Sequence, residues 1–140
     1  MLNTIIAPVD GSEGSTKAVR FAGQLAKQTG AELILMYVYD APTASAMGLA
    51  RQSREELEHV KEEVAKGSFQ AAEAVLEGTP AKRYVTFGHP SHEIVSYAKQ
   101  VKADLVVMGS RGLSQMEGLL LGSVSDQVVH HAHCAVTIVR

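Results

Sequence analysis

The sequence predicts a three-layer α/β fold, in which helices cover both faces of an open, five-stranded, mostly parallel sheet. Two observations carry this prediction. Short apolar runs alternate with longer segments of helical periodicity along the chain, an order typical of right-handed β–α–β crossovers. The chain has 140 residues, 46% of them hydrophobic, which is enough for a single core. Residues 1–140 are therefore expected to form one domain.

Each strand is predicted from a continuous apolar run bounded by turn-forming residues. Residues 4–9 (TIIAPV) stop at Asp10-Gly11-Ser12, and residues 32–39 (ELILMYVY) follow the break at Gly30. Runs without polar alternation indicate strands that are buried on both faces of a sheet. The remaining strands are expected at residues 83–87, 104–108 and 135–139.

The first helix is predicted between the first two strands. Its apolar stripe covers residues 15–29, Ser12 or Ser15 can act as the N-cap, and Gly30 ends it. Residues 41–52 contain small residues and a proline in no clear pattern, so they are expected to form a loop.

The longest predicted helix runs over residues 54–76, where apolar residues recur at helical spacing. Gly67 lies in its interior and weakens it by about 1 kcal/mol relative to alanine. Two further helices are expected at residues 91–101, capped by Ser91, and at residues 123–132.

Composition excludes several classes of partner. The formal net charge of −2 lacks the basic excess of a nucleic-acid-binding surface, and no run of about 18 apolar residues predicts a membrane span. The first residues do not resemble a signal peptide, and the single cysteine, Cys134, excludes an internal disulfide. We therefore expect a cytoplasmic protein with no nucleic-acid and no membrane partner.

Chemistry-bearing residues follow the first and the fourth predicted strands. Asp10 follows the first, and four glycines lie between Gly109 and Val124 after the fourth. If these strands are neighbours whose crossovers leave in opposite directions, both loops face the crevice where open α/β sheets bind ligands. An acidic residue there binds ribose hydroxyls or base amines in nucleotide-binding folds. The alternative is that Asp10 only fixes a turn with Ser12.

The glycine-rich segment predicts an anion site. Gly109 and Gly112 let main-chain N–H groups approach a phosphate without an intervening Cβ. Gly122 and Ser123 open the last helix, where N–H groups are unpaired and the dipole is positive. Ser123 can also serve as the N-cap, and Arg111 can offer its guanidinium to the same anion. The segment is neither a Walker A loop, which needs a lysine after its last glycine, nor a GxGxxG motif.

The spacing Gly109-x2-Gly112-x9-Gly122-Ser123 resembles the ATP-binding signature of the universal stress protein family. The opening IAPVDGSE, the GHP before a predicted helix, the later DLVVMGSRG and the final VTIVR are also similar to family segments. The resemblance therefore covers the whole chain.

This resemblance implies a Rossmann-like fold with strand order 3-2-1-4-5. It implies bound ATP, with ADP or AMP as alternatives, together with Mg²⁺ or Mn²⁺. It also implies a homodimer that pairs through the last strand, Ala135–Val139, and that can assemble into a higher oligomer.

Carried over to this chain, the resemblance assigns roles to three groups of residues. Asp10 would bind the sugar or base beside a wall shaped by Pro8 and Val9, and Val38 would meet adenine through its backbone. Those implied around the ribose and first phosphates are Met108, Gly109, Arg111 and Gly112, and those implied at the outer phosphates are Gly122, Ser123 and Val124.

The sequence leaves three classes of function open. The favoured class is a nucleotide-dependent regulatory or stress-response protein with slow or no hydrolysis, because no arginine finger is visible beyond Arg111 and charge stabilisation drives phosphoryl transfer. The alternatives are a weak ATPase or nucleotidyl-type transferase, and a nucleotide-free dimeric scaffold. No metal site is predicted at His130, His131, His133 and Cys134, because their spacing does not place ligands on one helix face.

Overall fold

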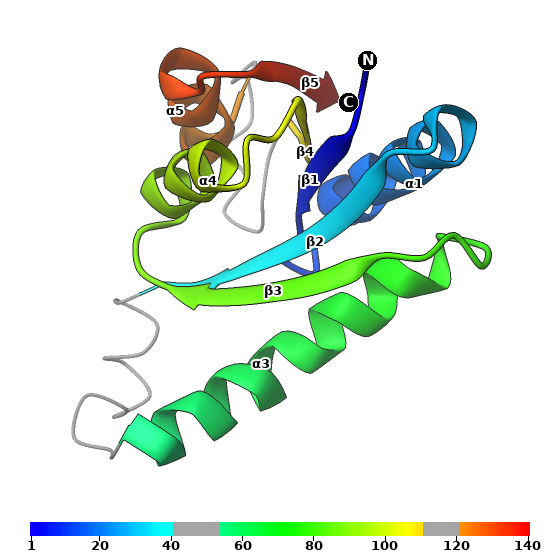
Figure 1. Ribbon diagram of the computed structural model, residues 1–140. Helices are drawn as coiled ribbons and strands as arrows, with labels where there is room; N and C mark the ends of the chain where they lie inside the picture. Colours follow the sequence, from blue (N-terminus) through cyan, green and yellow to red (C-terminus); the bar gives the residue numbers. More distant parts are fainter. Residues whose placement is uncertain (41–53, 111–120) are drawn as a thin grey trace.

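Parallel strands build one sheet in the order β3-β2-β1-β4-β5, with helices on both of its faces (Figure 1). This computed structural model describes residues 1–40, 54–110 and 121–140. It confirms the predicted fold class and strand order. The elements in chain order are β1 (Thr4–Pro8), α1 (Glu13–Thr29), β2 (Glu32–Tyr39), α3 (Arg54–Ala74), β3 (Lys82–Phe87), α4 (Pro90–Gln100), β4 (Leu105–Gly109), α5 (Ser123–His131) and β5 (Ala135–Val139).

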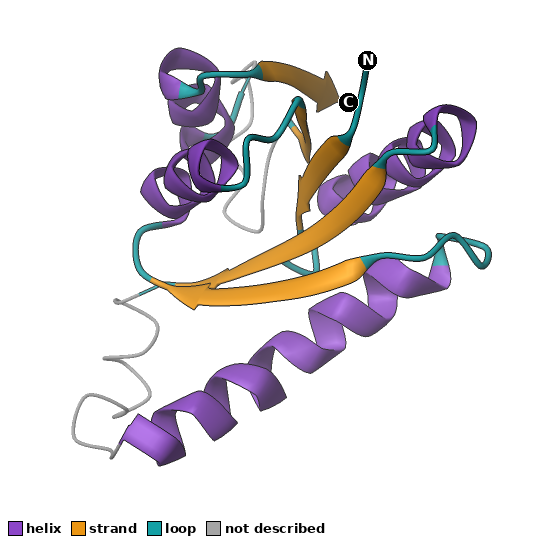
Figure 2. Cartoon of the chain, viewed as in Figure 1, coloured by secondary structure: helices purple, strands orange, loops and turns teal. Residues whose placement is uncertain are grey.

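Helices cover the sheet on both faces (Figure 2), and a separate hydrophobic core lies between the sheet and each pair of helices. On the face covered by α1 and α3, Phe69 belongs to the same cluster as Leu35 of β2. On the face covered by α4 and α5, Ile94 and Val128 belong to the same cluster as Met36. Successive side chains of a strand point to opposite faces, so β2 feeds both cores. Burial on both faces explains why the strands lack polar alternation.

The first and fourth strands are neighbours, with Ile5 opposite Leu105. A carboxylate holds the amino ends of this pair together. Asp104 Oδ2 accepts the main-chain N–H groups of Asn3 at 2.8 Å and Thr4 at 2.9 Å. Asp104 therefore precedes β4 as a linking residue, and the strand begins one residue later than predicted.

The predicted boundaries of α1 are confirmed to within two residues. Ser12 is its N-cap and accepts the N–H of Ser15 at 3.2 Å, and Gly30 follows its last residue in the left-handed conformation. The helix begins at Glu13 because Ser12, rather than Ser15, is the cap. In the described parts of the chain, no helix has the length and apolar character needed to span a membrane.

Two other predicted N-caps are wrong. His89 is the N-cap of α4 and Pro90 is its first residue, since the fixed φ of proline suits the first helical position. Ser91 therefore lies inside the first turn. Gly122 is the N-cap of α5, and Ser123 is its first helical residue.

Candidate functional site

The carboxyl ends of β1 and β4 form a switch point in the sheet. The helix after β1, α1, lies on one face, and the helix after β4, α5, lies on the other (Figure 1). The pairing of β1 with β4 confirms the neighbour relation that the sequence argument assumed. Open α/β sheets bind ligands at such points, so this edge is the candidate site.

Asp10 forms a tight turn directly after β1. Its Oδ1 accepts the N–H of Ser12 at 2.8 Å, and its own N–H lies 3.3 Å from the hydroxyl oxygen of Ser15. Gly11 has a φ of +83°, which glycine adopts without a steric penalty. Among the described residues, none hydrogen-bonds to the second carboxylate oxygen of Asp10. One oxygen thus fixes the turn, and the other can accept a hydrogen bond from a ligand.

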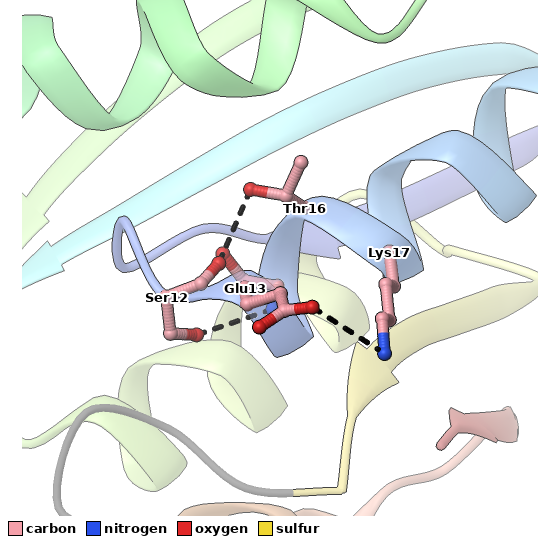
Figure 3. Close-up of polar contacts among 5 residues, drawn as sticks. Ser12, Glu13, Thr16 and Lys17 are labelled. Atoms are coloured by element: carbon pink, nitrogen blue, oxygen red, sulfur yellow. Dashed lines mark hydrogen bonds and ion pairs between the residues drawn. The ribbon is translucent and has the colours of Figure 1, made fainter.

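The N-terminus of α1 is closed by its own side chains (Figure 3). Besides the cap by Ser12, the hydroxyl of Thr16 donates to the Ser12 carbonyl at 3.1 Å. On the exposed side, Lys17 Nζ lies 3.7 Å from Glu13 Oε1. The side-chain cap occupies one of the first amides of this helix, which makes α1 a poorer anion site than a helix without such a cap.

Gly109, the last residue of β4, is required by a close approach inside the protein. An added Cβ would lie 2.8 Å from the main-chain carbon and oxygen of Gly14 in the first turn of α1. This contact packs α1 against the end of β4. The predicted reason for this glycine was the approach of a phosphate, and the structure supplies a different reason that acts in the absence of any ligand.

Ser110 connects the end of β4 to both α5 and β5. Its carbonyl accepts the N–H of Gly122 at 2.6 Å and the hydroxyl of Ser125 at 2.8 Å. Its N–H donates to the carbonyl of Val139 at 3.2 Å. These bonds hold the start of α5 against the end of β4.

The first turn of α5 presents the main-chain amides of the candidate anion site. Unlike α1, this helix has no side-chain cap hydrogen bond at its N-cap, Gly122. The N–H of Gly122 is used by the Ser110 carbonyl, so it is not available to a ligand. The next amides, those of Ser123 and Val124, belong to the first helical turn, whose N–H groups have no intrahelical acceptor. The Ser123 side chain is exposed beside them.

The main chain of Val38 faces the space beyond the end of β1. The carbonyl of Met36 accepts the N–H of Val9 at 2.8 Å on the β1 side, and the carbonyl of Tyr39 accepts the N–H of Gly88 at 3.0 Å on the β3 side. Main-chain groups alternate in direction along a parallel strand, so Val38 points the same way as Met36. The pairing with β1 ends opposite Met36. Within the described residues, the N–H and carbonyl of Val38 are therefore open to a planar ligand.

The remaining predicted residues lie on both sides of the sheet. Val9 is in the core under α1 and α3, and Met108 is in the core under α4 and α5. Val124 is partly buried against that second core, and Pro8 is partly buried at the end of β1. Because the side chains of Val9 and Met108 are buried, only their main chains can reach a ligand at the edge.

Two predicted residues, Arg111 and Gly112, fall outside the described residues. Within residues 1–40, 54–110 and 121–140, no group of three His, Cys, Asp or Glu side chains could hold a metal ion. The side chains of His130, His131 and His133 are exposed.

Tyr37, on β2, reports the electrostatics beside the Asp10 turn. Burial raises the pKa of its phenol above the ordinary value, and the nearby Tyr39, Asp40 and Asp10 raise it further. The direction of this pKa shift reflects the burial of Tyr37 and the acidic side chains near this end of β2.

Gly14, Ser110 and Ser125 were missed by the sequence analysis. Gly14 is the residue that β4 packs against, and the two serines form the link between β4 and α5. The only local signal was the second serine of GSVS, in the first turn of the predicted last helix.

Comparisons with known proteins give a consistent result. A family model described as the universal stress protein family matches residues 1–140. Universal stress protein YxiE of Bacillus subtilis is 34% identical over 148 aligned positions that cover 100% of both chains.

Solved structures of similar fold point to the same family. Universal stress protein UspA from Lactobacillus plantarum superposes with a TM-score of 0.81 and 29% identity, over 99% of this chain and 98% of that one. A universal stress protein solved in complex with cAMP has a TM-score of 0.69 and 30% identity, over 99% and 97% of the two chains.

Proposed function

This chain belongs to the universal stress protein family, and from that premise we propose that it binds an adenine nucleotide, in the first place ATP. The nucleotide would lie at the carboxyl ends of β1 and β4. Its binding would regulate the protein in a cytoplasmic stress response, with slow or no hydrolysis.

The observation that carries the proposal is the arrangement of three open polar groups around one edge of the sheet. They are the free carboxylate oxygen of Asp10, the main chain of Val38 and the first turn of α5. The carboxylate oxygen can accept a hydrogen bond from a ribose hydroxyl, and the main chain at the end of β2 can pair with the edge of a purine. The positive end of α5 suits a phosphate. The related protein solved with cAMP supports this choice of ligand class.

The outer phosphates would be held by the amides of Ser123 and Val124 and by the Ser123 hydroxyl. Arg111 and Gly112 would complete the phosphate site, and Gly122 would allow close approach, while its own N–H serves Ser110. Pro8, Val9, Met108 and Gly109 would frame the sugar and first phosphates through their main chains. A bound Mg²⁺ or Mn²⁺ would neutralise part of the phosphate charge.

The regulatory role is favoured over an enzymatic one. In the described part of the chain, the first turn of α5 carries the carboxylate of Asp126, and His130 Nε2 lies 3.5 Å from it, but both side chains are more than half exposed to solvent. An exposed pair of this kind is weakly held and does not provide a fixed base for a water molecule. Phosphoryl transfer depends on such positioning and on charge stabilisation. A turnover within the ordinary enzyme range of about 1–1000 per second would show instead that the protein is an ATPase or a transferase.

The phosphate position is tested by Ser123→Asp. A carboxylate in the first turn of α5 is favourable for the helix dipole, so the fold should be retained or slightly stabilised. The same charge should repel a triphosphate, and the affinity for ATP, measured by calorimetry, should fall about tenfold or more.

Gln100→Glu is the matched control. Gln100 is the exposed last residue of α4, a helix on the same face of the sheet as α5. It lies near the amino ends of the strands, whereas the proposed site lies at their carboxyl ends. Its change to Glu adds the same charge as Ser123→Asp. ATP affinity should stay at the wild-type value in this variant. Unchanged affinity in a folded Ser123→Asp protein would place the phosphates elsewhere.

We also propose that two chains pair through β5. This strand is an edge of the sheet, and unpaired edges are ready templates for strand addition. A nucleotide-free scaffold would share this property, so nucleotide binding and dimer formation need separate measurements.

A further inference from the structure

We propose that Ser125 is a positioning residue for the nucleotide phosphates. Its hydroxyl would set the direction of the first turn of α5 by holding the Ser110 carbonyl. The inference rests on the proposed nucleotide function, and it adds a residue that lies behind the binding surface.

Ser125 is buried, with 2% of its surface exposed. Its hydroxyl oxygen lies 2.8 Å from the Ser110 carbonyl oxygen and 3.1 Å from that of Gly122. A hydroxyl has a single proton to donate, and serine in a helix ordinarily spends it on a carbonyl three or four residues earlier. Here the closer acceptor belongs to Ser110, at the end of a different element. The side chain therefore connects α5 to β4 rather than only closing its own turn.

The Ser110 carbonyl sits where it would disturb an anion. It accepts the N–H of Gly122, the residue directly before the amides proposed to bind phosphate. A carbonyl oxygen carries partial negative charge, so an exposed one beside this turn would repel a phosphate. Two donors on the same oxygen offset that charge and fix its direction. Loss of the Ser125 hydroxyl leaves a single donor and a freer carbonyl.

Ser125 also limits the motion of the first turn of α5, because it ties this turn to Ser110. The Ser110 N–H is bound to Val139 of β5, so Ser110 is held from both sides. A helix turn that is fixed to such a residue keeps its amides aimed in one direction, and binding then loses less conformational entropy.

The test compares Ser125→Ala with wild type, using ATP and adenosine as two probes in calorimetry. Loss of one buried hydrogen bond should weaken ATP binding about five- to tenfold. Adenosine has no phosphate, so its affinity should stay within about twofold of wild type. Amide hydrogen exchange of Gly122, measured without ligand, should become faster, while exchange in β1 should not change.

Ser91→Ala is the matched control. Ser91 is also a buried serine in the first turn of a helix on the same face, and its hydroxyl donates to Gln127 of α5. It should lose a similar amount of stability without the selective loss of ATP affinity. Ser125→Thr, which keeps the hydroxyl, should restore ATP affinity if the added methyl is accommodated, as near-ultraviolet circular dichroism would show.

The outcomes separate this inference from the proposed function. If wild type binds neither ATP nor adenosine, the proposed function is wrong and the inference falls with it. If wild type binds ATP and folded Ser125→Ala binds it equally well, or loses ATP and adenosine alike, only the positioning role of Ser125 is overturned.

Discussion

Gly109 could be needed either to admit a ligand or to allow close packing inside the protein, and the sequence alone could not tell which of the two applies. Its neighbour is the main chain of Gly14, which cannot move aside as a flexible side chain would. Gly109→Ala should therefore lower the free energy of unfolding by about 1–3 kcal/mol, as overpacking of a tight contact does. Urea denaturation in the absence of nucleotide measures this loss.

Gly67→Ala is the matched control for that experiment. Gly67 lies in the interior of α3, and an added Cβ would meet nothing within 4 Å. The same substitution there should raise stability by about 1 kcal/mol, because alanine is the better helix former. If Gly109→Ala did not lower the free energy of unfolding, the inference that α1 packs closely against Gly109 would be wrong.

Residue roles could be predicted from sequence only where the role depends on local chemistry. The turn residue Asp10 and the cap Ser12 interact within a few positions of themselves, and turn and capping rules cover that range. The link from Ser125 to Ser110 spans 15 residues and depends on how α5 packs against β4. No local rule reports such a contact.

At the scale of elements, the strands and helices were predicted from apolar runs and helical periodicity. Their boundaries differ by at most two residues, and two N-caps were assigned to the wrong residue. Both Ser91 and Ser123 have good N-cap chemistry, yet each lies one or two residues inside its helix. In α4, proline at the first position decided the start. In α5, the Gly122 N–H is bound to a neighbouring element, so tertiary contact overrode the capping preference of the side chain.

The amino ends of β1 and β4 are tied by a charge, which predicts a pH dependence. Hydrogen bonds from the main-chain N–H groups of Asn3 and Thr4 lower the pKa of Asp104 below its ordinary value of 3.8. A group whose pKa is lower in the folded state stabilises the fold above its unfolded pKa, and this contribution disappears as the pH falls through the folded pKa. Asp104→Asn removes the titration.

The urea midpoints of wild type and Asp104→Asn should therefore differ most near neutral pH, with wild type more stable. The difference should shrink as the pH is lowered through about 4 and below. A difference that stays constant from neutral to acidic pH would mean that the ionised carboxylate does not hold the two strands.

At the scale of the whole molecule, the sequence predicted the layers, while the strand order came from the family resemblance. Alternating elements indicate a parallel sheet, but nothing in the apolar runs says that β4 lies beside β1. That neighbour relation places Asp10 and α5 at one edge, so the candidate site could be assembled from sequence only by assuming it. Residues 111–120 contain Arg111 and Gly112, whose roles stay predictions.

The proposed dimer can be tested by a substitution in β5, and the direction of the main-chain groups along this strand decides which residue to change. The carbonyl of Val139 points toward β4, where it accepts the Ser110 N–H. Main-chain groups alternate in direction along a strand, so those of Val136 point away from β4, toward the open edge. Val136→Pro removes an N–H from that edge without removing a bond to β4, and proline is tolerated on edge strands.

Val136→Pro should therefore shift the protein from dimer to monomer while it remains folded, as sedimentation equilibrium and circular dichroism would show together. Val136→Ala, which trims the same side chain but keeps the N–H, should remain dimeric, because pairing of the strand uses main-chain hydrogen bonds. Proline at the next residue tests the inferred direction of these groups. The main-chain groups of Thr137 point toward β4, so Thr137→Pro should remove a hydrogen bond between β5 and β4 and destabilise the fold. A folded Val136→Pro dimer would rule out pairing through this strand and leave the assembly to another surface.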